Sequence, residues 1–167
     1  MLLFLIFFSF IIAILDASFF PAIKIAGGVI ELTTITMLLL VFLGSFRNAS
    51  IFLVLSVIFL TLLTKIPPIY FLIPNFIILA IFVFLASKRI VSKPGTLLSF
   101  SIFFFAVLVA DLVKLTILAE FSFSNLSIAL FDGLYSAIFA TIIYWISNKI
   151  YHFFNPQIIG EEIKFAK

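Results

Sequence analysis

The chain has 167 residues, of which 65% are hydrophobic and 10% are charged, and its mean hydropathy is +1.42. A soluble domain is about 45–50% apolar and about 25% charged, so a water-soluble fold is excluded because it could not bury this much apolar surface. The absence of cysteine excludes disulfides and thiolate chemistry, the single histidine excludes a multi-histidine metal site, and a formal charge of +3 is too small to indicate a nucleic-acid partner.

The chain contains six apolar stretches, most of them close to the roughly 17–25 residues that a helix needs to cross a bilayer. In chain order they cover residues 2–20, 29–46, 49–64, 69–87, 96–119 and 126–147. We expect Pro21 to end the first stretch, and the second and third to be joined by a short turn containing Arg47. The third stretch is short, so whether it spans the membrane is left open, as is a continuation of the last stretch to residue 154. Pro74 with Asn75 indicates a kink, or an entry from the outer interface, in the fourth.

Helices are expected because every backbone amide in lipid must find a partner within its own segment or in a closed barrel. A barrel strand would show alternation over about 10 residues, and the run 101–109 does not alternate. We therefore predict an all-α, polytopic membrane protein with one domain over residues 1–154 and a short polar, cytoplasmic tail over residues 155–167. The first stretch has no basic segment before it and no good cleavage site, so it is expected to be retained as a helix.

Basic residues predict the orientation, because cytoplasmic loops carry an excess of lysine and arginine. With both termini in the cytoplasm, the outer loops carry only Lys24 and Lys65, and Lys114 lies within a helix. The inner segments then carry the other seven basic residues, Arg47, Lys88, Arg89, Lys93, Lys149, Lys164 and Lys167. Topology and attraction to anionic lipids explain the basic loop at residues 88–93 without a protein partner.

Charged side chains within the apolar stretches need a reason, since each costs at least about 2.5–3.5 kcal/mol near the bilayer centre. The candidates for structural or docking roles are Asp16, Glu31, Asp111, Lys114 and Asp132. Asp111 and Lys114 are three residues apart, so they can pair on one helix face. Two interpretations stay open: a neutralised pair whose lysine reaches the outer headgroups, or part of a polar cavity or helix contact.

Glu31 and Asp132 fall at the beginnings of predicted helices, where a carboxylate favours the helix dipole, so helix capping is the expected role. The sequence does not decide whether the acidic residues of different helices converge. We find no phosphate loop, nucleophile triad or acidic metal cluster, and we expect neither enzymatic activity nor a cofactor. Few glycines predict bulky helix contacts filled with phenylalanine.

Two segments carry a resemblance to a known family. The first is Val29-Ile30-Glu31-Leu32 with its aliphatic run to Phe42, and the second is the last helix, from Asp132-Gly133-Leu134 to Ile150. With the hydropathy layout, they resemble the bacterial rod shape-determining protein MreD family, although that family usually has Pro-Asp where this chain has Ile30-Glu31. Its third helix is usually glycine-rich and ends in Asp, whereas residues 51–64 contain neither residue type.

The resemblance implies a non-catalytic component of the cell-shape and peptidoglycan elongation machinery in the bacterial inner membrane. Its implied partners are an MreC-like scaffold, a RodA-like glycosyltransferase, a class B penicillin-binding transpeptidase and an MreB-like filament. The rival is the substrate-binding component of an energy-coupling-factor vitamin transporter, which would place the outer acidic residues in a pocket. Such a component also needs small-residue helix faces, of which Ala137 with Ala140 is the nearest approach. A lipid-handling protein is a third possible class, but no specific feature of the sequence favours it.

Overall fold

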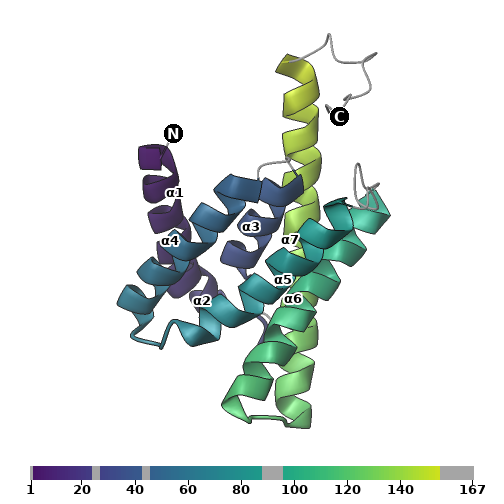
Figure 1. Cartoon of the computed structure of the whole chain (residues 1–167). Coiled ribbons are helices and arrows are strands. Elements are labelled where there is room, and N and C mark those ends of the chain that lie inside the picture. The colour runs from purple at the N-terminus through teal and green to yellow at the C-terminus, as the bar shows by residue number, and fades with distance from the viewer. Residues whose placement is uncertain (1, 24–26, 43–45, 88–95, 155–167) are drawn as a thin grey trace.

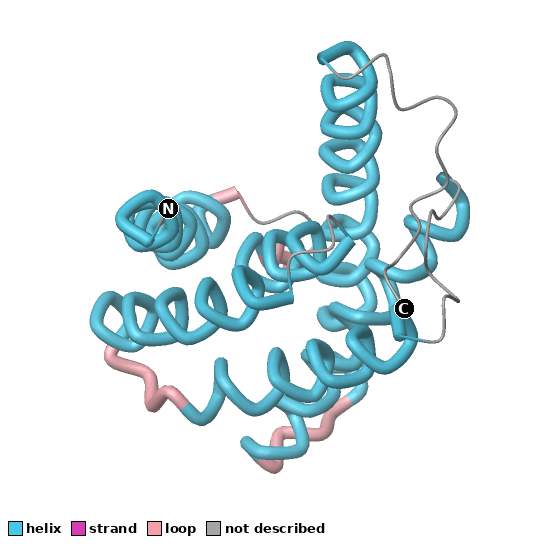
Figure 2. The backbone as a smooth tube through the Cα atoms, turned by 45° about the horizontal axis from the view of Figure 1, so that its top comes forward, coloured by secondary structure: helices cyan, strands magenta, loops and turns pink. Residues whose placement is uncertain are grey.

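The computed structural model describes residues 2–23, 27–42, 46–87 and 96–154, and within them it contains helices and no strand (Figure 1, Figure 2). The prediction of an all-α protein is confirmed. The elements are α1 (Leu2–Ile14), η1 (Leu15–Phe19, a π-helix), α2 (Phe20–Ala22), α3 (Leu32–Phe42), α4 (Phe46–Thr64), α5 (Ile69–Ser87), α6 (Thr96–Leu118) and α7 (Phe123–Phe154). Residues 155–167, predicted as a polar tail, lie outside the described residues.

Among the described residues, four helical stretches are long and apolar enough to cross a membrane: Leu2–Ala22, Phe46–Thr64, Leu97–Leu118 and Phe123–Ser147. Two shorter apolar helices, Leu32–Phe42 and Ile69–Leu85, accompany them. In an 18-residue apolar window of each long stretch, only 22–33% of the residues are buried inside the protein, so most of the side chains there are at least partly exposed. An apolar helix that is exposed over most of its surface is stable only where lipid is the solvent, and these features are those of a membrane protein.

The first helix does not end at Pro21, as predicted, but continues to Ala22. A π-turn over Leu15–Phe19 precedes the proline, and the N–H of Phe20 bonds back to the carbonyl of Leu15. This wider turn changes the helical register, so that Pro21 falls in the first turn of α2. A proline is tolerated there because its missing N–H is not needed.

Helices α3 and α4 correspond to the second and third predicted stretches, but their first residues differ from the prediction. Residues 29–31 are not helical, so α3 has only 11 residues and is about 16 Å long at about 1.5 Å per residue. Arg47 was predicted to lie in the connection between two helices, but it lies in the first helical turn of α4. Helix α4 therefore has 19 residues, and the expectation that it is short was wrong. The connection between these helices, residues 43–45, lies outside the described residues.

The remaining helices follow the sequence prediction more closely. Helix α5 covers 69–87 with Pro74 inside it, and α6 ends at Leu118, where Ala119 takes a left-handed φ of 54°. The predicted last helix reaches Phe154, but it begins at Phe123, three residues earlier than expected. The start of α1 and the end of α7 lie at the same end of the molecule (Figure 1).

The short helix α3 is the centre of the fold, because it contacts α1, η1, α4, α5, α6 and α7. Its seven consecutive residues from Leu32 to Leu38 are all buried, which means that protein covers every face of its first two turns. A helix that starts inside the protein needs internal partners for its first N–H groups. This requirement leads to the polar site described below.

The expectation of bulky helix contacts is right in one place and wrong in another. Around Phe42, the rings of Phe82 and Phe103 pack edge-on at centroid distances of 6.1 and 5.5 Å. Between α6 and α7, however, a Cβ added to Gly133 would lie 3.3 Å from the backbone oxygen of Phe104. Small residues therefore allow a close α6–α7 crossing even though glycine is rare in the chain.

Candidate functional site

The N-terminus of α3 is capped by a side chain from another helix. Asp16, in the π-turn, accepts hydrogen bonds from the backbone N–H of Leu32 to Oδ1 and of Thr33 to Oδ2, both at 2.7 Å. Asp16 therefore satisfies two of the N–H groups that a helix start leaves without a helical partner. Glu31 does lie at the start of α3, where its carbonyl accepts the N–H of Ile35 and its carboxylate accepts the hydroxyl of Thr34, but the acceptors for the free N–H groups come from Asp16.

The extended segment before α3 is held against α7. The N–H of Val29 donates to Asp132 Oδ1, and the N–H of Glu31 donates to Ser136 Oγ at 3.0 Å. A Cβ added to Gly28 would lie 2.9 Å from Cβ of Phe131, so the segment rests directly on the helix. The predicted capping role of Asp132 is wrong. Because α7 begins at Phe123, Asp132 lies well inside the helix and bonds to another segment instead of its own N-terminus.

Lys114 joins two acidic side chains. Its Nζ lies 3.0 Å from Asp111 Oδ1, which confirms the pairing predicted from their spacing, and it also bonds to Oε1 of Glu31. The side chains of Lys114, Glu31 and Asp111 are 24%, 17% and 10% exposed. Of the two interpretations left open by the sequence, the structure supports an internal polar contact between helices. Asp111 Oδ2 is buried and has no hydrogen-bond partner among the described residues.

Thr34 and Asn75 extend this network to α5. Thr34 Oγ1 lies 2.9 Å from Glu31 Oε2 and 2.8 Å from Asn75 Oδ1, so its single hydroxyl proton is within reach of two acceptors. The Nδ2 of Asn75 donates to the carbonyl of Phe71 at 3.0 Å. From the sequence, Asn75 was expected to mark a kink or an entry from the outer interface, although a buried amide in an apolar helix is itself a signal of an interhelical hydrogen bond.

The acidic residues therefore converge, which the sequence could not decide. They come from four places in the chain: Asp16 from η1, Glu31 from the segment before α3, Asp111 from α6 and Asp132 from α7. An open pocket of about 260 Å³ lies beside them. Its polar lining consists of Asp16, Glu31, Thr33, Thr34, Thr64, Asn75, Lys114 and Asp132.

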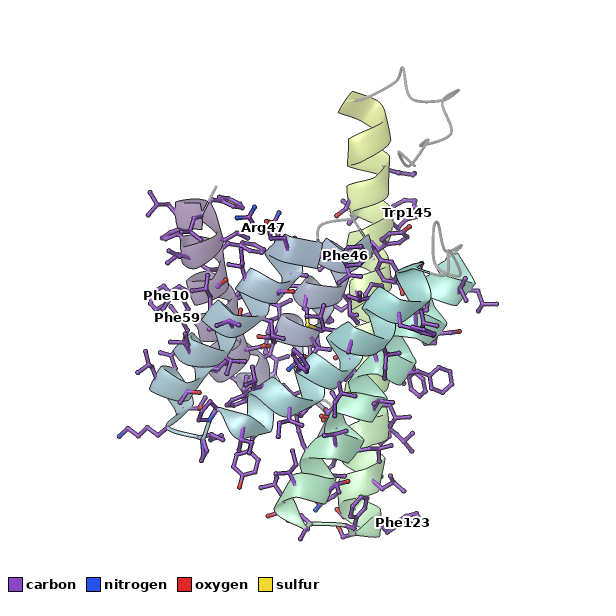
Figure 3. The ribbon with its side chains drawn as sticks, in the orientation of Figure 1. Phe10, Phe46, Arg47, Phe59, Phe123 and Trp145 are labelled. Atoms are coloured by element: carbon purple, nitrogen blue, oxygen red, sulfur yellow. The ribbon has the colours of Figure 1, made fainter. Side chains whose placement is uncertain are left out.

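The predicted topology-determining residues lie apart from this cluster. Arg47 is exposed in the first turn of α4, and Figure 3 shows it toward the end of the molecule where α1 begins. Lys149 lies over the ring of Trp145, with Nζ 3.9 Å from the ring centroid. Lys88, Arg89 and Lys93 lie outside the described residues. Among the residues that are described, no group of three or more His, Cys, Asp or Glu side chains is arranged to hold a metal ion.

Comparisons with protein-family models, with curated proteins and with solved structures gave no match to this chain. The chemistry of the site therefore has to be inferred from its geometry. Carboxylates that accept backbone N–H groups and share one lysine hold helices together. The pocket beside them can also receive a small polar group.

Proposed function

We propose that this protein is a non-catalytic, integral component of the peptidoglycan elongation machinery in the bacterial inner (cytoplasmic) membrane. In this role it binds an MreC-like scaffold and, through it, a RodA-like glycosyltransferase, a class B penicillin-binding transpeptidase and an MreB-like filament. The proposal begins from the resemblance of residues 29–42 and 132–150 to the MreD family.

One observation carries the proposal: the two segments of the resemblance meet in the fold. Val29 bonds to Asp132, and Glu31 bonds to Ser136. Segments that are about 100 residues apart in the chain thus form one structural unit. A sequence pattern that marks a shared architecture is expected to be concentrated in such a unit, because its residues depend on one another for hydrogen-bond partners.

The use of the charged residues supports a scaffold rather than an enzyme. Asp16 holds α3, Asp132 holds the segment before α3, and Lys114 ties that segment to α6. A rigid bundle of this kind presents fixed apolar helix faces to other membrane helices. Docking between helices in lipid depends on such packing and on a few polar contacts.

The proposed topology has six crossings and both termini in the cytoplasm. Helix α3, which is too short to cross alone, makes the second crossing together with the extended segment before it. The start of α1 and the end of α7 lie at one end of the molecule, as an even number of crossings requires (Figure 1). Non-helical backbone at membrane depth is tolerated where protein covers it, and residues 29–31 are partly buried and hydrogen-bonded to α7.

The second candidate is a substrate-binding component of an energy-coupling-factor vitamin transporter. The pocket beside Asp16, Glu31 and Asp132 favours it, since a binding component needs a polar cavity within its helices. The two candidates predict different protein partners, so one experiment can separate them.

The test is affinity capture of the tagged, full-length protein from its native host in mild detergent, followed by identification of the co-purifying proteins. The matched control is an unrelated six-helix membrane protein with the same tag and expression level. Enrichment of an MreC-like protein with a RodA-like glycosyltransferase supports the scaffold. Enrichment of paired ATPases with a transmembrane coupling subunit overturns it in favour of the transporter component, and enrichment of neither set over the control counts against both.

A further inference from the structure

The pocket beside the buried cluster has an excess of negative groups. Its lining contains three carboxylates, from Asp16, Glu31 and Asp132, and one ammonium group, from Lys114, which gives a formal charge of −3 + 1 = −2. Behind Lys114, Asp111 adds a fourth carboxylate, whose Oδ2 is buried without a partner among the described residues. Buried carboxylates are costly unless cations or hydrogen-bond donors compensate them.

Most of the strong donors of this site are already used. The N–H groups of Leu32 and Thr33 bind Asp16, and two of the three protons of Lys114 are directed to Glu31 and Asp111. The acceptors are not used up, because each carboxylate offers about four lone-pair positions. A ligand that fits this site must therefore bring donors and positive charge. An anion would find neither a free helix N-terminus nor an uncommitted lysine.

Thr33 provides an independent indication of a ligand-binding position in this pocket. Its side chain lines the pocket and the residue is 3% exposed. The hydroxyl lies beside the Asp16 carboxylate, but it makes no hydrogen bond of acceptable geometry. A buried hydroxyl without a partner is unfavourable, and a donor placed in the pocket would satisfy it.

From these observations we infer that the pocket binds the primary ammonium group of a small molecule, between the hydroxyl of Thr33 and the carboxylates of Asp16 and Asp132. An ammonium group supplies positive charge and three N–H donors to a site whose carboxylates outnumber its charged donors. The volume of about 260 Å³ holds a ligand of a few heavy atoms and is below the usual range for drug-sized molecules. This inference does not depend on the scaffold or transporter assignment, since it rests only on the pocket.

The test uses the full-length protein in detergent micelles or nanodiscs, with ethylammonium chloride as the probe. The midpoint of thermal unfolding is measured as a function of the ethylammonium concentration. Sodium chloride and tetramethylammonium chloride serve as controls at equal ionic strength. A ligand that binds only the folded state raises the unfolding midpoint. We expect a saturable rise with ethylammonium that neither control ion reproduces. The absence of a saturable rise, or an equal rise with either control ion, would overturn the inference.

A second measurement addresses the site. The Thr33→Val substitution removes the hydroxyl, keeps the shape and leaves the backbone N–H of Thr33 bonded to Asp16. We expect the half-saturating concentration to increase by about tenfold or more, as for the loss of a hydrogen bond to a charged group. Thr141→Val is the matched control, because Thr141 also has a buried hydroxyl without a partner and does not line the pocket. Equal affinity in the Thr33 and Thr141 variants would contradict the assigned site. If the Thr33 variant fails to fold, the comparison of the three ions with the wild-type protein still decides whether an ammonium group binds.

Discussion

Lys114 on α6 donates a hydrogen bond to the carboxylate of Glu31, which lies 83 residues earlier in the chain. The same ammonium group holds Asp111, one turn away on its own helix. Because Glu31 immediately precedes α3, this contact ties the central helix of the fold to α6. The contact is mostly shielded from solvent, so it is expected to contribute more than an exposed ion pair does.

A double-mutant cycle tests this contact. We expect Lys114→Gln to reduce the free energy of unfolding by about 3–5 kcal/mol, because it leaves buried carboxylates without their counter-ion. Glu31→Gln removes one of those carboxylates, so the double variant should lose less than the sum of the two single losses. The measurement is reversible unfolding in mixed micelles. Additivity within about 0.5 kcal/mol would contradict a direct coupling between the two residues.

The cap of α3 gives a second prediction. Asp16→Ala removes both acceptors for the N–H groups of Leu32 and Thr33, and loss of a cap typically costs about 0.5–2 kcal/mol. We expect the amide protons of these two residues to exchange with solvent faster than in the wild type. Hydrogen exchange with mass spectrometry measures this, and Glu120→Ala serves as the control because Glu120 is exposed at the end of α6. Unchanged exchange at the start of α3 would show that Asp16 does not hold it.

The close α6–α7 crossing is tested at Gly133. A Cβ there lies 3.3–3.4 Å from atoms of Phe104, including its backbone oxygen, which cannot move aside easily. Gly133→Leu should therefore reduce the free energy of unfolding by about 1–3 kcal/mol, the usual cost of overpacking. Gly133→Ala should cost less, since alanine favours the helix by about 1 kcal/mol in compensation. Thermal unfolding of the two variants checks the order, and a leucine variant as stable as wild type would mean that the helices are not in close contact.

The proposed topology is testable because the chain has no cysteine. Single cysteines are introduced at Phe121, exposed between α6 and α7, and at Arg47, exposed at the start of α4. In intact spheroplasts, a membrane-impermeant maleimide should label Phe121→Cys, whereas Arg47→Cys should react only after permeabilisation. The wild-type protein controls for non-specific reaction. Labelling of the Arg47 variant in intact spheroplasts would mean that the protein has the opposite orientation to the one proposed.

The apolar stretches could be predicted well, whereas several of their ends could not. Stretch 69–87 was placed correctly because its composition changes sharply at both ends. The start of α3 was missed because Val29 and Ile30 are as apolar as the helix that follows. They are not helical because side chains of α7 hold the backbone N–H groups of Val29 and Glu31, and no local pattern indicates such partners.

The same limit applied to the charged residues. The spacing of Asp111 and Lys114 within one helix was enough to predict their pairing, because helix geometry alone brings them together. Capping by Asp16 depends on a π-turn and on the position of α3. Neither feature can be predicted from the residues next to it in the sequence. Glu31 and Asp132 were assigned to capping because they lay near apparent helix starts. Asp132 instead binds the segment before α3, and the carboxylate of Glu31 reaches Lys114 on α6 as well as Thr34 of its own helix.

The sequence by itself determined that the chain is helical and belongs in a membrane, because the balance of apolar and charged residues depends only on composition and on runs along the chain. It also identified which charged residues need an explanation. Only the tertiary structure decided that Asp16, Glu31, Asp111 and Asp132 gather around Lys114, that α3 is central, and that a pocket lies beside them. These features are contacts between residues far apart in the chain, and the physical reason for them is the need of each buried charge and N–H group for a partner.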